Sequence, residues 1–275
     1  MIINHNLMAM NAHRQLKINN RFQAKNLEKL SSGYRINRAG DDAAGLSISE
    51  KMRNQIRSLQ QASRNAQDGI SLIQTAEGAL NESHNIMKRM RELTIQAANG
   101  TNEVEDINAI TAELDSLVSE LDRIANSTEF NKKKLLNGDL VGGLILQIGA
   151  NEPIAENTLT IDVAAMDSGN LGVAAVGGIT DHTSAMTQLL AIDGGIGILS
   201  AERSKLGAFQ NRLEHTIVNL DNTVENVQAA ESRIRDVDMA NEMSAFTKNN
   251  ILMQASTAML AQANQMPQGV LQLLR

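Results

Sequence analysis

Apolar residues recur every seven positions along much of the chain, which is typical of long helices that pack side by side. One long helix is predicted at about residues 43–99, where the repeat consists of Leu59, Ala66, Ile73, Leu80 and Met87. From about residue 184 a second long helix is predicted, and its repeat consists of Leu206, Leu213, Leu220, Val227 and Ile234. A shorter helix is predicted at about residues 104–126, with a stripe at Ile107, Ile110, Leu114, Leu117, Leu121 and Ile124.

These stripes predict one helical bundle with a buried seam. Three positions after each heptad residue of the first long helix comes a second series that is mostly small, and small residues allow a neighbouring helix to come close. That series consists of Ala62, Gly69, Ala76, Ser83 and Met90. We expect the seam to bury Leu59, Ile73, Leu80, Leu114, Leu121, Leu213 and Leu220.

Both ends of the chain are predicted to be amphipathic helices that are marginal on their own, at about residues 1–32 and 239–275. The first is rich in Asn, a weak helix former, and Pro267 and Gly269 are expected to interrupt the second near its end. Helices with so little core of their own need a partner, which is either the other end or further copies of the chain. The residues expected to take part in assembly are Ile3, Leu7, Met10, Leu27, Leu30, Phe246, Leu252, Met259, Met266 and Leu273.

Strand signals are confined to the middle of the chain. Apolar and other residues alternate at 144–148 and again at 159–163, which predicts a small hairpin-like β element at about residues 140–165. Residues 164–183 are small and Gly-rich, and they are predicted to form a loop. The expected fold class is therefore mainly α, a long antiparallel helical bundle or coiled coil with a small β-hairpin element.

Composition narrows the possible chemistry. The chain has no Cys, which excludes disulfides and thiolate metal sites. Residues 1–40 hold seven Lys or Arg against one acidic residue, but no stacking aromatics accompany them, so a nucleic-acid-binding arm is disfavoured. No apolar run approaches the roughly 18 residues of a membrane span, and the first residues do not read as a Sec signal peptide. Export by another route is expected.

Catalytic signals are weak throughout. None of the five His residues forms a His-Glu-x-x-His zinc signature. The pair Asp41-Asp42 precedes a predicted helix, where an N-cap is a better interpretation than acid–base catalysis. The Gly pairs at 142–143 and 177–178 lack the Lys of a phosphate-binding loop. We therefore expect no catalytic, cofactor-binding or metal-binding residues, and no cofactor.

Several long motifs resemble those of bacterial flagellins. They occur in the flagellin order at Ser31–Leu46, Asn65–Leu80, Leu206–Leu213, Ala230–Asp238 and Gln254–Asn264. At Thr128–Asn131 the resemblance continues, but this chain has Lys132 where the family commonly has glycine.

The resemblance implies a minimal two-domain filament subunit. Residues 1–42 and 236–275 would form an inner coiled-coil domain, and residues 43–235 an outer rod-like domain. It also implies partners: copies of the chain in a helical homopolymer, a flagellar secretion chaperone, cap and hook-associated proteins, and the flagellar type III export apparatus. The implied location is the extracellular filament, without nucleic-acid binding or membrane insertion.

One segment resembles the part of flagellins that animal Toll-like receptor 5 recognises. It is Lys88–Gln96, and the resemblance assigns a receptor-recognition face to Arg89, Leu93 and Glu113. The alternative is that these residues only pack neighbouring subunits.

Two rival functions have related sequences. A hook–filament junction protein shares flagellin-like ends but usually departs from flagellins at Arg233–Asp238 and in the tail. A secreted enzyme on a flagellin frame would need a catalytic motif, and none was found. A structural filament subunit used for motility is the expected function.

Overall fold

The computed structural model describes residues 6–139, 142–150 and 154–273. The chain divides into two compact units, one formed by residues 1–56 with 225–275 and the other by residues 57–224. The domain boundaries expected at residues 42 and 236 both fall inside the first unit. Each long central helix contributes residues to both units, so neither boundary coincides with a loop.

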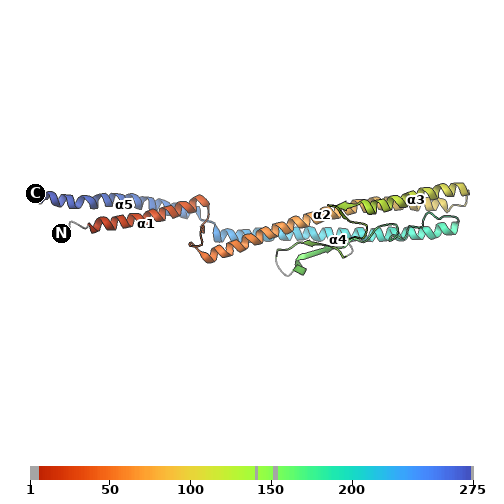
Figure 1. Cartoon of the computed structure of the whole chain (residues 1–275), viewed down its shortest axis with the longest axis horizontal. Coiled ribbons are helices and arrows are strands. Elements are labelled where there is room, and N and C mark those ends of the chain that lie inside the picture. The colour runs from red at the N-terminus through yellow and green to blue at the C-terminus, as the bar shows by residue number, and fades with distance from the viewer. Residues whose placement is uncertain (1–5, 140–141, 151–153, 274–275) are drawn as a thin grey trace. The chain divides into compact units, whose positions relative to one another are not determined.

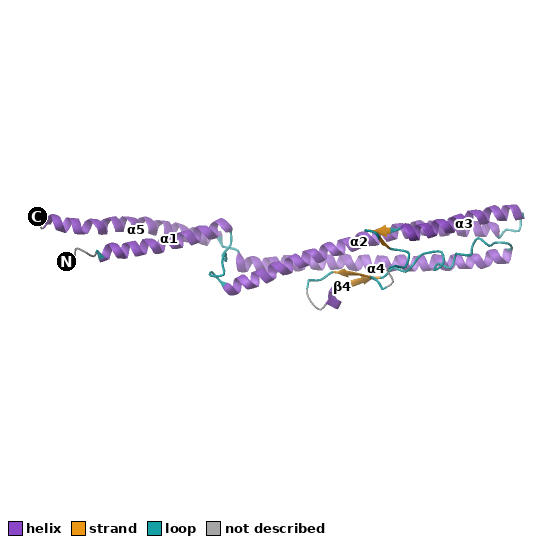
Figure 2. Ribbon diagram, viewed as in Figure 1, coloured by secondary structure: helices purple, strands orange, loops and turns teal. Residues whose placement is uncertain are grey.

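The chain is 74% helical, which confirms the predicted fold class (Figure 1, Figure 2). The α-helices of the described residues are α1 (Leu7–Ser32), α2 (Ala43–Ala97), α3 (Val104–Ser127), α4 (His182–Arg235) and α5 (Met239–Leu273). The short elements are β1 (Glu129–Phe130), β2 (Lys133–Lys134), β3 (Leu144–Gln147), the 3-10 turn η1 (Ile154–Asn157) and β4 (Thr158–Ile161). The predicted hairpin is confirmed, because β3 pairs with β4 in antiparallel register, Leu144 opposite Ile161.

Local sequence signals set most helix ends. The Asn6 side chain accepts a hydrogen bond from the Ala9 N–H and caps α1, and Gly33 ends that helix with a φ of 74°. Asp42 accepts from the Gly45 N–H at 2.9 Å, so the N-cap interpretation of this acidic pair is confirmed. The predicted interruption at Pro267 was wrong, since α5 continues through it to Leu273.

In the second unit, α2 and α4 run antiparallel and α3 packs back on α2 (Figure 1). Ion pairs show the direction: Arg91 contacts Asp193 at 2.7 Å, and Arg203 contacts Glu77 at 3.5 Å. The core on α4 consists of buried residues seven apart, Ala185, Ile192, Leu199, Leu206, Leu213 and Leu220. Every predicted seam residue is buried: Leu59, Ile73, Leu80, Leu114, Leu121, Leu213 and Leu220. At about 1.5–3 kcal/mol for each fully buried side chain of this size, the seam is a principal source of stability.

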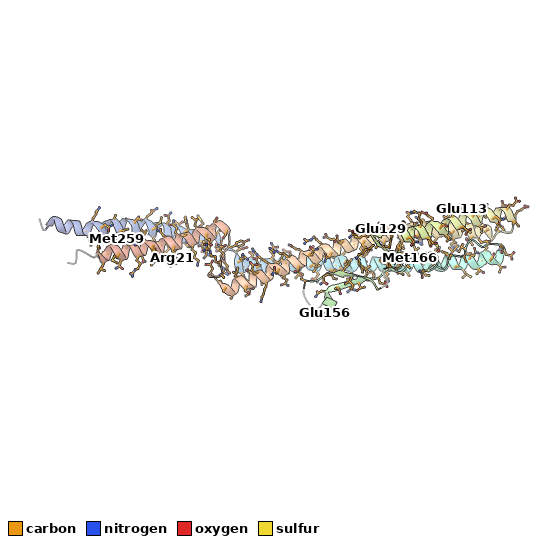
Figure 3. The ribbon with its side chains drawn as sticks, viewed as in Figure 1. Arg21, Glu113, Glu129, Glu156, Met166 and Met259 are labelled. Atoms are coloured by element: carbon orange, nitrogen blue, oxygen red, sulfur yellow. The ribbon has the colours of Figure 1, made fainter. Side chains whose placement is uncertain are left out.

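The segment after β4 corrects the sequence analysis. Residues 162–181 contain no helix or strand, as expected of a loop, yet they supply a strip of core side chains. The buried residues are Val163, Met166, Leu171, Val173, Val176 and Ile179, and Figure 3 labels Met166 beside the helices. Asp122 of α3 holds the strip by accepting from the Ser168 N–H at 2.8 Å and from its hydroxyl at 2.9 Å. Irregular spacing hid these residues, because a strip without a helical or strand period gives no periodic signal.

This strip needs a close approach to α4 at Gly195. A Cβ added to Gly195 would lie 2.9 Å from the Leu171 carbonyl oxygen and 2.6 Å from Cε of Met87. A glycine in the interior of a helix lowers its stability, and at Gly195 the missing side chain is what allows this close approach. Gly194, by contrast, has open space around its Cα.

The link between β1 and β2 contains a strained turn. Asn131 and Lys132 form the two-residue loop with φ values of 49° and 66°, as a type I′ turn requires. Asn tolerates the left-handed region, but Lys has a Cβ that clashes there. The resemblance to flagellins had flagged Lys132 at the position where glycine is common.

By length and hydropathy alone α4 is apolar enough to cross a membrane. Of that apolar window 22% is buried, and Met186, Leu190 and Ile198 of α4 are exposed.

The glycine contacts predict opposite effects for neighbouring substitutions in α4. Gly195→Ala should destabilise the chain by about 1–2 kcal/mol, because the Leu171 carbonyl cannot move as freely as a side-chain end. Gly194→Ala should stabilise it by about 0.5–1 kcal/mol, since alanine favours the helix. Denaturant unfolding of both variants checks this, and equal effects would refute the close approach.

The turn geometry predicts that Lys132→Gly stabilises the chain by about 1 kcal/mol, because glycine removes the left-handed strain. The matched control is Lys133→Gly, which lies in ordinary strand backbone and should lower stability by about 0.5–1 kcal/mol. Thermal unfolding of the two variants measures the difference, and a destabilised Lys132→Gly variant would contradict the turn assignment.

Candidate functional site

The candidate functional site is the pair formed by α1 and α5, the two ends of the chain. The helices lie side by side and antiparallel within the first unit (Figure 1). Along α1 a series of buried or half-buried residues is spaced alternately three and four apart: Ala9, Ala12, Leu16, Asn19, Gln23, Asn26 and Leu30. On α5 the half-buried residues with the same spacing are Glu242, Phe246, Asn249, Met253, Ser256, Leu260 and Ala263. This is heptad packing through faces that are largely small or polar.

Three asparagines supply hydrogen bonds between the two helices. Asn6 Nδ2 donates to the Ala263 carbonyl at 2.7 Å, and Asn19 Nδ2 donates to Ser256 Oγ at 2.9 Å. In the amide orientation that satisfies its neighbours, Asn26 donates to Glu242 Oε1 at 3.0 Å and accepts from Asn249 Nδ2 at 3.0 Å. The pair is therefore joined by polar contacts as well as by apolar ones.

Large apolar side chains outside the packed series of these helices are uncovered in the single chain. The exposed large side chains of α1 are Leu7, Met8, Met10, Ile18, Phe22 and Leu27, and those of α5 are Met239, Met243, Ile251, Leu252, Met259 and Met266. A groove of about 640 Å³ between the helices is lined in part by Met8, Leu252, Met259 and Met266. Figure 3 labels Met259 and Arg21 on this pair. Exposed apolar surface on this scale is a mark of an interaction site.

The predicted assembly residues divide between the two faces. Leu7, Met10, Leu27, Leu252, Met259 and Met266 are 41–67% exposed. Leu30 and Phe246 lie on the face that packs within the chain. Ile3 and the side chain of Leu273 lie outside the described residues. The single stripe expected on each helix is in fact two faces, one satisfied within the chain and one not.

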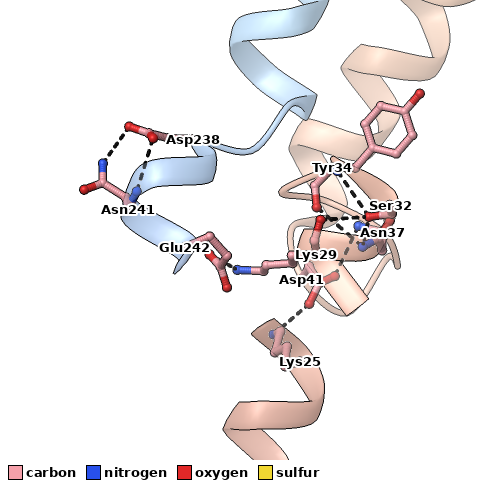
Figure 4. A network of polar contacts seen from close by, with 9 residues as sticks. All are labelled: Lys25, Lys29, Ser32, Tyr34, Asn37, Asp41, Asp238, Asn241 and Glu242. Atoms are coloured by element: carbon pink, nitrogen blue, oxygen red, sulfur yellow. Dashed lines mark hydrogen bonds and ion pairs between the residues drawn. The ribbon is translucent and has the colours of Figure 1, made fainter. Parts of the chain in front are cut away.

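Polar contacts tie α1 to the start of α5 and to the loop that follows α1 (Figure 4). Lys29 contacts Glu242 at 3.8 Å, and Lys25 contacts Asp41 at 2.7 Å. The hydrogen bond from the Lys25 ammonium holds the pKa of the Asp41 carboxyl below its ordinary value. Lys25 and Lys29 of α1 thus form ion pairs inside the first unit, and they hold α1 in place at this end of the pair.

Sequence reasoning missed the clamp around Tyr34, the one tyrosine of the chain. Its ring lies between two guanidinium groups, with Cζ of Arg53 at 5.3 Å and Cζ of Arg235 at 5.0 Å from the ring centroid. Arg53 also contacts Glu231 at 2.9 Å, and Arg235 contacts Glu50 at 2.6 Å. The available signal was the position of the tyrosine inside the flagellin-like motif that begins at Ser31.

The residues assigned to receptor recognition do not share one face. Arg89 and Glu113 are exposed and form an ion pair between α2 and α3, with Arg89 Nη2 2.9 Å from Glu113 Oε1. Leu93 is only 2% exposed and belongs to the core of the second unit. A partner that reads this surface therefore meets the ion pair and not the Leu93 side chain.

The described part of the chain offers no group of three or more His, Asp or Glu side chains that could hold a metal ion. The site offers exposed apolar side chains that can associate with a partner, and polar contacts that align α1 with α5.

Comparisons with known proteins agree with this arrangement. Residues 3–140 match the bacterial flagellin N-terminal helical region, and residues 189–274 match the bacterial flagellin C-terminal helical region. The chain is 61% identical to a flagellin of Halalkalibacterium halodurans over 100% of both chains. It is 49% identical to the flagellar filament 33 kDa core protein of Treponema phagedenis, again over 100% of both.

A solved structure shares the fold. The putative flagellar hook-associated protein of Vibrio parahaemolyticus matches with a TM-score of 0.60 and 14% identity, covering 71% of this chain and 100% of that one. At that identity the match concerns fold alone. Because the two family regions cover both helical ends and the relatives match throughout, this chain belongs to the bacterial flagellins.

Proposed function

We propose that this chain is a structural subunit of the flagellar filament, and that copies assemble through the apolar faces that α1 and α5 leave exposed. The observation that carries the proposal is the contrast between the two units. In the second unit the heptad residues are buried within the chain, whereas in the terminal pair most of the larger apolar residues are exposed. Relatives that match the whole chain are named as flagellins and filament core proteins.

The energetics favour association of many copies. Each Leu, Ile, Met or Phe that becomes fully buried contributes about 1.5–3 kcal/mol. Ordering the side chains and joining two subunits cost free energy, so one such contact is not enough. Twelve exposed large apolar residues on the pair provide a surface that can repay those costs when several neighbours cover it.

Export and its partners form a finer part of the proposal. A chain without Cys carries no disulfide that would prevent its passage in an unfolded state. We assign the export to the flagellar type III apparatus, without a Sec signal peptide, and the placement of subunits to the cap and hook-associated proteins. A secretion chaperone would cover the apolar face of α5 before assembly, since that face is exposed in the free chain.

We prefer a structural role to a catalytic one because the features that stand out in the described residues are exposed apolar side chains on α1 and α5 and ion pairs between helices. The proposal also favours the filament over the hook–filament junction, since relatives with full coverage are named for the filament or as flagellin. Seeded growth separates these roles, because a filament subunit extends seeds over long distances whereas a junction protein does not.

Recognition by Toll-like receptor 5 is proposed through the exposed Arg89–Glu113 ion pair. In this arrangement Leu93 supports α2 from the core and does not touch the receptor.

The proposal predicts that deletion of residues 246–275 abolishes filament growth. The deletion removes Met253 and Leu260 from the packed face, and Leu252, Met259 and Met266 from the exposed face. The core of the second unit contains none of these residues, so the truncated chain should remain soluble and helical. Circular dichroism and sedimentation after addition of seeds measure both properties.

A point variant refines this experiment. Met259→Asp should reduce growth because it places a charge on the exposed apolar face, whereas Met259→Leu should retain it. Filaments formed by the truncated chain would refute the role of the ends in assembly.

A further inference from the structure

The face of α1 that packs on α5 contains polar residues where apolar ones would stabilise the pair more. Asn19 and Asn26 are 7% and 9% exposed, and both lie at heptad positions. A buried Asn at such a position lowers stability but restricts the alignment of two helices, because only one alignment satisfies its amide. The question is which alignment these residues select.

Asn19 and Asn26 cannot select it alone. They are seven residues apart, which is the repeat of the packing itself. After a slip of one heptad, Asn26 would reach the level of α5 that Asn19 occupies now, and Ser256 would again meet an amide. A further contact is needed, from a residue whose spacing from Asn19 and Asn26 is not a multiple of seven.

Asn6 supplies that contact. It precedes Asn19 by 13 residues, so it is out of step with the heptad. Its Nδ2 donates to the Ala263 carbonyl at 2.7 Å, while its Oδ1 accepts from the Ala9 N–H at 3.0 Å. One side chain thus caps α1 and bonds to α5.

The acceptor of this bond, the Ala263 carbonyl, lacks its usual donor within α5. In an α-helix the carbonyl of residue 263 would accept from the N–H of residue 267, but residue 267 is proline and has no N–H. Since α5 continues through Pro267, that carbonyl loses its partner within the helix. The Asn6 amide replaces the missing donor from the neighbouring helix.

We propose that Asn6 and Pro267 together fix the register of the α1–α5 pair, with Asn19 and Asn26 restricting the remaining alignments. A slip of one heptad moves Asn6 away from Ala263 and leaves the carbonyl without a donor from either helix. The inference deepens the proposed function, because identical outer faces in every subunit require one alignment of the two ends.

Distances between spin labels test the register in the full-length chain. The chain has no Cys, so labels at Lys17→Cys and Lys248→Cys, both on exposed residues, are unambiguous. A slip of seven residues displaces one label along the helix axis by about 10 Å. The unsubstituted labelled chain should give one dominant distance.

Asn6→Asp is the informative variant, because aspartate still caps α1 but cannot donate to Ala263. It should add a second population at a shifted distance. The control Asn20→Asp makes the same chemical change on the exposed side of α1 and should leave one distance. A single unshifted distance in Asn6→Asp would overturn the proposal.

Pro267→Ala separates register from stability. It restores the missing N–H, so α5 should become more helical while the alignment becomes less unique. Asn6→Asp should then have little further effect in the Pro267→Ala chain, as a double-mutant cycle measures. An equal effect of Asn6→Asp in both backgrounds would show that Asn6 acts independently of Pro267, and would overturn the proposal.

Filament growth of the same chains keeps the two claims apart. If the unsubstituted chain gives one distance but grows no filament, the proposed function fails and the register assignment stands. If it grows filaments while Asn6→Asp retains a single unshifted distance, the register assignment fails and the proposed function stands.

Discussion

The structure depends on where apolar heptad residues find a partner. In the second unit, α2, α3 and α4 bury theirs against one another, and residues such as Ile73, Leu114 and Leu213 are fully buried within one chain. In the terminal pair the packed faces are largely small or polar, with Leu16, Leu30, Phe246, Met253 and Leu260 as exceptions, and twelve other large apolar residues are exposed. The same seven-residue repeat thus produces a self-sufficient bundle in the middle and an incomplete one at the ends.

Close packing of the second unit depends on small residues at particular places. Gly195 admits the backbone at Leu171, and Gly69 leaves room for Leu146 of β3, whose Cδ1 would lie 2.4 Å from an added Cβ. These approaches allow the strip at residues 162–181 and the β3–β4 hairpin to cover the helices without a further domain. Irregular segments and a short hairpin thus complete the core of the second unit.

The sequence predicted the features that have a period. All seven seam residues, the helices and the hairpin followed from spacing alone, since burial on one face imposes that spacing. The core residues from Met166 to Ile179 were missed because their spacing has no helical or strand period. The Tyr34 clamp was missed because its partners, Arg53 and Arg235, lie far apart in the chain.

The terminal helices show a further limit of pattern reading. The apolar residues of α1 were predicted to form one stripe, but the structure places Leu30 against α5 and leaves Leu7 exposed. A helix that serves both a partner within the chain and partners outside it carries two overlapping patterns. Similarly, Pro267 was expected to interrupt a helix, yet α5 continues through it, and the Ala263 carbonyl accepts a hydrogen bond from Asn6.

The central claim is that the ends are completed by other copies of the chain, and amide hydrogen exchange tests it most directly. In the monomer, residues 7–32 and 239–266 should exchange faster than residues 59–93, because their apolar faces are in contact with solvent. In assembled filaments the ends should become strongly protected, while the protection of residues 59–93 changes far less. Ends that exchange equally fast before and after assembly would contradict the account.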